Sequence, residues 1–257
     1  MIILITAAVV LIGLFIFFQF RKSGNSLPEK TVPGEQIQLL ETHVKYFRNL
    51  QPEQKAIFAK RVGEFLNRVT IEGVGTTAEL SDRVLVAASA LIPVFGLGDW
   101  KYPNLTNVIL YPDNFNKDFQ FEGNGRSTLG MVGTGYMNGQ MILSKPALVA
   151  DFAHADSKNN TAIHEFVHLL DKTDGSTDGI PENLMDRSSL LPWQNLKQQE
   201  IEKINKGESD IDPYALTGDA EFFAVVSEYF FQQPHLLAEN HPEVYKMLKE
   251  FFKQNLG

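Results

Sequence analysis

Residues 164–168, HEFVH, constrain the fold of this chain more than any other segment. They form the pattern HExxH, in which three residues separate His164 from His168. Four residues make about one turn of an α-helix, so both imidazoles project from one face, about 6 Å apart, and can bind one Zn²⁺ at about 2.0–2.1 Å. The flanking residues 161–163 and 169–170 contain no Pro or Gly, which favours a helix. The sequence therefore predicts a helix with two metal-binding imidazoles on one face.

The apolar neighbours of this pair argue against a solvent-facing helix with two ordinary histidines. Ile163, Phe166, Val167 and Leu170 predict a largely buried helix. Burying two imidazoles and a carboxylate without a metal or partner is costly, so we expect a metal site. The 257 residues include no cysteine, so its ligands must be histidines and carboxylates. Glu165 can accept a proton from a water activated by the metal and deliver it to a leaving amine.

A catalytic zinc site also needs a third protein ligand and one open position. Residues 220–230, AEFFAVVSEYF, form an apolar helical segment with two carboxylates, Glu221 and Glu228. These glutamates lie seven residues apart on one face, and the spacing allows either to reach the metal. Asp171 shares the helical face of the two histidines. It either orients one imidazole through its second nitrogen or is a plain carboxylate near the end of the helix.

The chain begins with an apolar segment that predicts a transmembrane anchor. Residues 1–20, MIILITAAVVLIGLFIFFQF, carry no charge and as a helix would be about 30 Å long, the thickness of a bilayer's hydrocarbon core. A cleaved secretory signal would have a basic start, a shorter apolar run and a small-residue cleavage site. We therefore expect the span to remain. Arg21, Lys22 and Lys30 follow it and no basic residue precedes it, so the positive-inside rule predicts a cytoplasmic body.

The remainder of the sequence predicts one α+β domain over residues 35–257. Residues 21–34, which contain Gly, Ser and Pro without hydrophobic periodicity, are typical of a linker. The expected elements, in chain order, are two helices on either side of residues 50–52, a strand over 68–73, a helix over 81–92 ended by Pro93, a strand over 108–111, a glycine-rich loop over 123–139, a strand over 140–144, helices over 146–152 and 160–171, a long loop over 172–188, and helices over 190–206, 218–232 and 241–255.

Charge and motif content exclude two other classes of function. The net charge is −8 and no basic stripe appears beyond the membrane flank, so nucleic acid is not an expected partner. The glycine-rich stretch lacks the Lys-Ser/Thr pattern of a phosphate-binding loop. Other histidines and the tryptophans match no ligand spacing or stacking role and are expected to be structural or surface residues: His43, His154, His235, His241, Trp100 and Trp193.

Several short motifs make the sequence resemble the Mlc titration factor A family of zinc peptidases. They are 50–54, LQPEQ; 79–82, ELSD; 108–112, VILYP; 164–171, HEFVHLLD; 174–175, DG, with 178–181, DGIP; and 212–214, DPY, followed by 220–228, AEFFAVVSE. The resemblance covers residues 36–255, nearly the whole body of the chain. Its N-terminal span departs from the better-known soluble members.

This resemblance implies a fold and roles for particular residues. It implies a gluzincin-like α+β metalloprotease domain with a small mixed sheet, similar in catalytic arrangement to the metalloprotease domain of anthrax lethal factor. The third zinc ligand would be Glu221, seven residues after Tyr214, and Glu228 would lie outside the first ring of ligands. The Tyr214 hydroxyl would stabilise the oxyanion formed when water attacks a peptide carbonyl. Without the resemblance, Tyr214 can equally be an amphipathic residue at a helix entrance.

The sequence thus predicts a membrane-anchored zinc peptidase with one Zn²⁺ per chain, bound by His164, His168 and Glu221. The family suggests aminopeptidase activity on short peptides, with endopeptidase action on a protein still open. An exposed edge of the strand over 140–144 is expected to align the substrate backbone. The alternative is a binding protein that sequesters a transcriptional regulator, with catalysis secondary. A closed structural zinc site is a third reading, but such sites are usually rich in cysteine.

Overall fold

A computed structural model describes residues 33–133, 138–154, 156–182 and 184–257. The expected transmembrane span 1–20 and nearly all of the expected linker 21–34 lie outside these residues. The described body begins with three helices, α2 (Gly34–His43), α3 (Lys45–Arg48) and α4 (Pro52–Arg68). Two helices were expected here, but Val44 adopts an extended backbone and divides the first in two. Pro52 begins α4, and the Gln54 side chain accepts the backbone N–H of Gln51, which caps the start of the helix.

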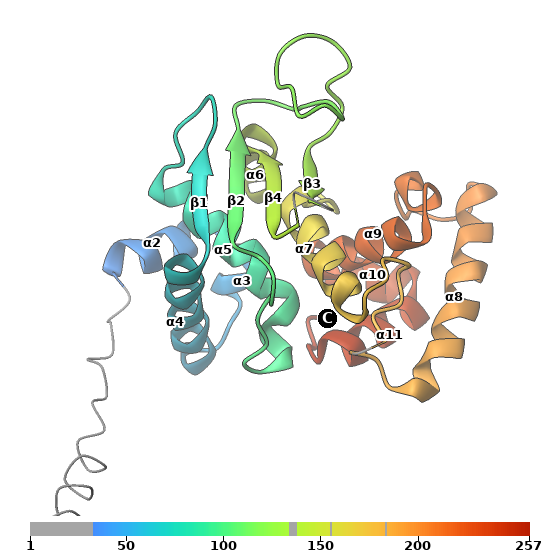
Figure 1. Cartoon of the computed structure of the whole chain (residues 1–257). Helices are drawn as coiled ribbons and strands as arrows, with labels where there is room; N and C mark the ends of the chain where they lie inside the picture. Colours follow the sequence, from blue (N-terminus) through green and yellow to red (C-terminus); the bar gives the residue numbers. More distant parts are fainter. Residues whose placement is uncertain (1–32, 134–137, 155, 183) are drawn as a thin grey trace, which may run out of the picture. The chain divides into compact units, whose positions relative to one another are not determined.

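The predicted small mixed sheet is confirmed (Figure 1). Three parallel strands, β1 (Thr70–Gly73), β2 (Asn107–Tyr111) and β4 (Gln140–Ser144), lie in the order β1-β2-β4. The fourth strand, β3 (Gly130–Val132), pairs antiparallel with β4 and forms the edge. The expectation that residues 140–144 have an exposed edge is therefore wrong, because β4 is paired on both sides and β3 holds that position.

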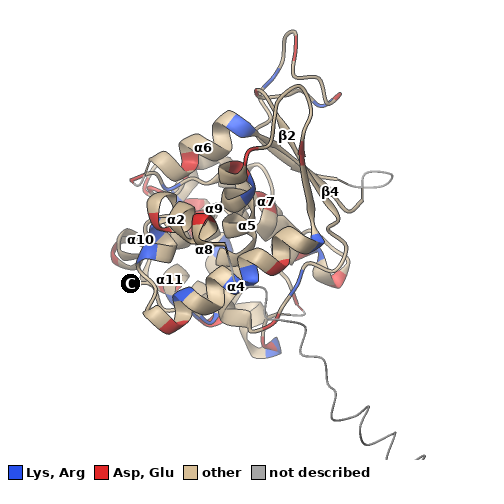
Figure 2. Ribbon diagram, turned by 90° about the vertical axis from the view of Figure 1, so that its left-hand side faces the viewer, with Lys and Arg blue, Asp and Glu red and all other residues tan. Residues whose placement is uncertain are grey.

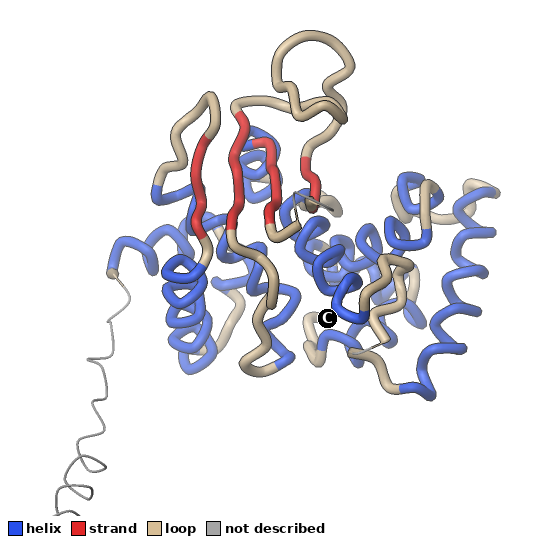
Figure 3. The backbone as a smooth tube through the Cα atoms, viewed as in Figure 1, coloured by secondary structure: helices blue, strands red, loops and turns tan. Residues whose placement is uncertain are grey.

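Both faces of the sheet are covered. The cross-strand pairs Val108–Met141 and Leu110–Leu143 are buried on one face, which contacts helices. On the other face, Tyr111 and Ile142 pack with aromatic side chains from the segment between β2 and β3: Phe115, Phe119 and Phe121. Figure 3 shows the strands gathered in one part of the domain, with most of the later helices beside them.

A largely buried helix, α5 (Leu80–Val94), runs through the core. Pro93 was expected to end it, but the proline lies inside the last turn, and the helix ends one residue later at Val94 before the short η1 (Phe95–Leu97). The Arg61 guanidinium donates to the carbonyls of Val94 and Phe95, groups left without helical partners at this end. Among the described residues, Leu80–Leu97 is apolar and long enough to cross a membrane, and 67% of it is buried in the domain.

The remaining helices build the part of the domain beyond β4. In order they are α6 (Lys145–Ala153), α7 (Thr161–Asp171), η3 (Lys172–Asp174), α8 (Arg187–Asn205), η4 (Pro213–Leu216), α9 (Asp219–Gln232), α10 (Pro234–Asn240) and α11 (Pro242–Phe252). The sequence predicted all of the longer ones but not the seven-residue α10. Figure 2 shows Lys and Arg interspersed with Asp and Glu along the helices of this negatively charged protein. Helix α7 packs against α5, α9 and β3, so the HExxH segment lies between the sheet and the C-terminal helices.

Candidate metal centre

The helix that carries the HExxH segment is held at its N-terminus by three polar side chains. Asn160 is buried and its side chain accepts the backbone N–H of Ile163 at 3.0 Å, as an N-cap does. The carboxylates of Asp151 and Glu228 accept the backbone N–H groups of Thr161 and Asn160 at 2.7 and 2.5 Å. These contacts satisfy backbone donors that a helix start leaves free and fix where α7 begins.

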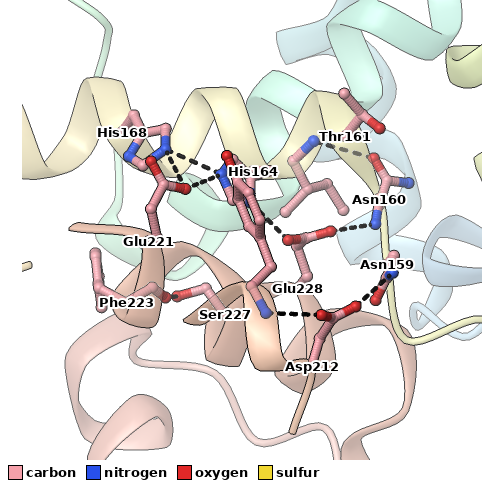
Figure 4. Close-up of polar contacts among 12 residues, drawn as sticks. Asn159, Asn160, Thr161, His164, His168, Asp212, Glu221, Phe223, Ser227 and Glu228 are labelled. Atoms are coloured by element: carbon pink, nitrogen blue, oxygen red, sulfur yellow. Dashed lines mark hydrogen bonds and ion pairs between the residues drawn. The ribbon is translucent and has the colours of Figure 1, made fainter. Parts of the chain in front are cut away.

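Three electron-donating atoms converge on one point beside α7 (Figure 4). The Nε2 atoms of His164 and His168 lie 3.0 Å apart. Oε2 of Glu221, from α9, lies 2.9 Å from Nε2 of His164 and 3.4 Å from Nε2 of His168. The structure thus brings together the three residues that the sequence and the family resemblance assigned to the metal, although they come from two helices.

This geometry fits a single metal ion. Atoms bound at about 2.0–2.1 Å in a tetrahedral arrangement lie about 3.3 Å from one another. The separations of 2.9, 3.0 and 3.4 Å among His164, His168 and Glu221 are close to that value. Two imidazole nitrogens and one carboxylate oxygen are also a common donor set of catalytic zinc sites, which leave a fourth position open.

The electrostatics of the site favour a positive charge. Burial alone would lower the pKa of His164, but the charge of Glu228 and hydrogen bonds to Glu221 and Glu228 outweigh it and raise the pKa to about 10. Burial would raise the pKa of the Glu221 carboxyl, yet its contacts with His164 and His168 hold it well below the usual range. A proton or a metal cation can supply the charge that this arrangement demands.

Spacing left open whether Glu221 or Glu228 reaches the metal. In the structure the two carboxylates lie at different nitrogens of the His164 ring. Glu221 lies at Nε2 of His164, on the side of His168, whereas Oε1 of Glu228 lies 2.6 Å from Nδ1 of His164. Glu228 therefore faces away from the point of convergence and is placed to orient His164 and fix its tautomer. It is 6% exposed, and its second oxygen is used by Asn160.

Glu165 lies beneath the edge strand of the sheet. It is 7% exposed, and its burial raises the pKa of its carboxyl, against the opposing influence of the nearby histidines. A Cβ atom added to Gly130 of β3 would lie 2.8 Å from Oε1 of Glu165. The strand can lie this close to the carboxylate only because residue 130 has no side chain. The sequence did not single out Gly130, since it is one of six glycines in the stretch 123–139.

Tyr214 lies over the same site from η4. Its ring centroid is 6.0 Å from that of His164, with an angle of 49° between the planes, and the residue is 53% exposed. Partial burial raises the pKa of its hydroxyl, and the charges of Glu221, Glu165 and Glu228 raise it further. The hydroxyl therefore keeps its proton at neutral pH and can donate a hydrogen bond near the point of convergence.

Asp171 does not orient an imidazole directly. Oδ2 of Asp171 accepts the backbone N–H of Gly179 at 2.8 Å. Among the described residues, neither Oδ1 of Asp171 nor Nδ1 of His168 has a hydrogen-bond partner. The Gly179 carbonyl accepts Nε1–H of Trp193, so this contact anchors the loop after α7 to the core. Trp193 is fully buried, as expected of a core residue.

The other histidines lie away from the ligand atoms. His43, His154 and His235 are exposed, whereas His241 is buried in a separate polar cluster. A cavity of about 550 Å³ also lies elsewhere, with Tyr46 and Asp151 in its wall and none of the three candidate ligands.

Comparisons with known proteins agree with this geometry. The family described as glucose-regulated metallo-peptidase M90 matches residues 18–253. An uncharacterised protein of Synechocystis sp. is 27% identical over 235 residues, which cover 87% of this chain and 85% of the relative. Mlc titration factor A of Serratia proteamaculans is 31% identical over 202 residues, which cover 73% of this chain and 74% of the relative. The chain therefore belongs to the glucose-regulated metallo-peptidase M90 family, which implies a metal ion and for which the structure offers a His-His-Glu site.

Proposed function

We propose that this protein is a zinc-dependent peptidase whose metal is bound by His164, His168 and Glu221. The observation that carries the proposal is the convergence of two Nε2 atoms and one carboxylate oxygen at separations of 2.9–3.4 Å, with the carboxyl group of Glu165 buried beside them. A catalytic site differs from a closed structural one by its open fourth position, and the donor set here supplies three protein ligands.

The proposed chemistry divides among a few side chains. When bound, a zinc ion would polarise the peptide carbonyl and lower the pKa of a water molecule. Glu165 accepts the proton of the attacking water and passes it to the leaving amine, a role suited to a carboxyl whose pKa is raised by burial. The Tyr214 hydroxyl donates a hydrogen bond to the carbonyl oxygen as that oxygen gains negative charge. Glu228 keeps His164 in one orientation throughout.

The edge strand β3 is the proposed place where the substrate backbone aligns. Among the strands that the structure describes, β3 pairs with β4 alone, and its Gly130 backbone lies against Glu165. A peptide added to the free side as a further strand would have its main chain held by hydrogen bonds next to the catalytic carboxyl. The family resemblance favours aminopeptidase action on short peptides, so we propose cleavage near the substrate's N-terminus.

Residues 1–20 are proposed to anchor this domain in a membrane, with the body at 35–257 on the cytoplasmic side. Fractionation of cells that express the full chain, followed by protease treatment of intact cells, tests the anchor and its orientation. We expect the protein in the membrane fraction and uncut. A mature form that begins after residue 20 would show a cleaved signal instead.

A second candidate function is suggested by the name Mlc titration factor A, which several relatives carry. These names suggest that the chain also binds a transcriptional regulator, with peptide hydrolysis secondary. The substitution Glu165→Gln separates the two functions, because it removes the proton acceptor while leaving the surface of the protein nearly unchanged. A cellular role that survives Glu165→Gln would support regulator binding, and a role lost with it would support catalysis.

Digestion of a peptide library by the full chain, with and without added zinc, tests the proposed activity. We expect cleavage that a chelator abolishes and zinc restores. Glu165→Gln should retain zinc and lose nearly all turnover, since an amide cannot accept the proton from water. Equal cleavage by the wild type and Glu165→Gln would contradict the mechanism.

A further inference from the structure

A carboxylate hub centred on Asp210 joins the elements that build the candidate site. Asp210 lies between α8 and η4, four residues before Tyr214. Its Oδ2 accepts hydrogen bonds from Nζ of Lys158 at 2.6 Å, the Tyr229 hydroxyl at 2.8 Å and Nδ2 of Asn240 at 2.9 Å. Its Oδ1 lies 2.7 Å from Nε2 of His241. One carboxylate therefore holds four side chains.

Two partners of Asp210 lie in or next to the helices that carry the metal ligands. Lys158 precedes Asn160, the cap of the HExxH helix, by two residues, and it also donates to the backbone carbonyl of Asp210 at 2.8 Å. Tyr229 follows Glu228 in α9, the helix that also carries Glu221. The hub thus ties the segment that leads into η4, which carries Tyr214, to the starting point of α7 and to the body of α9.

The hub is ionic. Nδ1 of His241 lies 2.8 Å from Oε2 of Glu200, so both ring nitrogens face carboxylate oxygens. A carboxylate only accepts hydrogen bonds, which makes the ring an imidazolium that donates from both nitrogens. Burial would lower the pKa of His241, but these two carboxylates raise it. The cluster therefore holds two carboxylates and three cations. Asp210 faces Lys158 and His241, and Glu200 faces His241 and Lys203.

Asp212 links the same segment to the backbone of Tyr214. Oδ1 of Asp212 accepts the backbone N–H of Tyr214 at 2.9 Å, and Oδ2 of Asp212 accepts Nδ2 of Asn159 at 3.3 Å. Two consecutive residues before α7, Lys158 and Asn159, thus hold Asp210 and Asp212. Among the described residues, no hydrogen bond fixes the Tyr214 hydroxyl, so its place over His164 depends on the backbone of this segment.

We infer that Asp210 is a positioning residue that sets the height of Tyr214 above the metal ligands by tying the 210–214 segment to Lys158 and His241. The inference rests on the proposed role of Tyr214 as a donor in the transition state. An ion cluster that only stabilised the fold would change the free energy of unfolding without acting through Tyr214. The two roles differ in whether the effects of Asp210 and Tyr214 on the rate are independent.

A double-mutant cycle in the full, zinc-loaded chain tests this dependence, with alanine para-nitroanilide as substrate. Asp210→Asn places an amide NH₂ against donors that need an acceptor. We expect it to lower kcat by about tenfold or more, as a small misplacement of a catalytic group does, with zinc content unchanged. In the Tyr214→Phe background the same change should lower kcat by less than about twofold. Effects that multiply would overturn the inference.

Two further comparisons keep the test decisive. Glu208→Gln changes an exposed carboxylate two residues away and should leave kcat unchanged. If Asp210→Asn does not fold, Lys158→Met takes its place in the cycle and should lower kcat in the same way. Lys158→Arg keeps a cationic donor, so its kcat should lie close to that of the wild type. Failure of Lys158→Arg to recover kcat, or an unaltered kcat in both Asp210→Asn and Lys158→Met, would overturn the inference.

A readout that needs no turnover separates this inference from the proposed function. In protein labelled with carbon-13 at Cζ of tyrosine, the resonance lost in Tyr214→Phe is that of Tyr214, and its chemical shift at one fixed pH reports the surroundings of the ring. Asp210→Asn should shift this resonance, because the ring then lies differently over His164, whereas Glu208→Gln should not. A wild type that hydrolyses no substrate would contradict the proposed function, and a Tyr214 resonance that Asp210→Asn leaves unaltered would contradict the positioning role.

Discussion

The backbone of Gly130 lies so close to the side chain of Glu165 that a Cβ atom on residue 130 would stand 2.7 Å from Cγ of Glu165. The backbone of β3 therefore packs directly on the Glu165 side chain of the HExxH helix. This contact buries the Glu165 carboxyl, which raises its pKa, and it places the free edge of the sheet beside the group proposed to move protons. The lack of a side chain at Gly130 and the burial of Glu165, the proposed general base, therefore depend on each other.

Gly130→Ala tests this contact. The added methyl group must displace Glu165 or β3, so we expect kcat to fall by about ten- to a hundredfold while zinc stays bound, because no ligand moves. Zinc content and kcat are measured on the same sample. Gly63→Ala in α4 is the matched control, since the nearest atom to its added Cβ lies 4.0 Å away. Equal kcat in Gly130→Ala and Gly63→Ala would contradict the account.

Glu228→Gln tests the orientation of His164. The two oxygens of Glu228 accept hydrogen bonds from Nδ1 of His164 and from the backbone N–H of Asn160. An amide has only one oxygen, so it cannot accept both in the same way. We expect zinc affinity to fall by about ten- to a hundredfold, as is usual when the partner of a ligand imidazole is changed. Competition with a chromophoric chelator measures the affinity. An exposed glutamate in α11 gives the control Glu250→Gln, and matching affinities in the two variants would remove Glu228 from the site.

Asp151→Asn tests a pH dependence of stability at the start of α7. Burial raises the pKa of Asp151 from 3.8 to about 6, against the hydrogen bond from Thr161. Between about pH 3.8 and pH 6 the folded protein therefore holds a proton that the unfolded chain has released. The contribution of this proton to stability is present below that pH range and lost above it. Asparagine keeps an acceptor for Thr161 but has no charge.

Relative to the wild type, Asp151→Asn should accordingly be more stable near neutral pH than near about pH 4. We expect the difference in Tm between variant and wild type to grow by about 2–4 °C over that range, which corresponds to about 1 kcal/mol at this chain length. Thermal denaturation followed by circular dichroism, in one metal state throughout, gives both curves. A Tm difference that shrinks as pH rises would show that the sign of the pKa shift is wrong.

Local pattern predicted α7 well because its N-cap residue and its apolar positions lie within the segment itself. Asn160 is a favoured N-cap residue, and the residues after it form helices and alternate between core and ligand positions. The same patterns predicted β4 at its observed bounds and the mixed α+β class. Strand β3 could not be predicted, since three residues in a glycine-rich stretch carry no periodicity.

The assignment of Glu221 and Glu228 shows where spacing stops being informative. Seven residues in a helix span about 10.5 Å along its axis, and spacing says only that both glutamates share a face. Which one lies at which nitrogen of His164 depends on how α9 crosses α7, and packing of distant side chains sets that crossing. Asp210 was missed for a related reason, because its partners Lys158, Tyr229 and His241 are far from it in sequence.

The zinc content of the purified full chain, measured by mass spectrometry beside Glu221→Ala and Glu228→Ala, tests whether His164, His168 and Glu221 bind the metal. We expect about one zinc per chain in the wild type, since the described part of the chain offers a single set of three candidate ligands. Glu221→Ala should lose the metal, whereas Glu228→Ala should bind it more weakly but detectably, because Glu228 acts through His164. Retention of zinc by Glu221→Ala together with its loss from Glu228→Ala would contradict the account and assign the third ligand to Glu228.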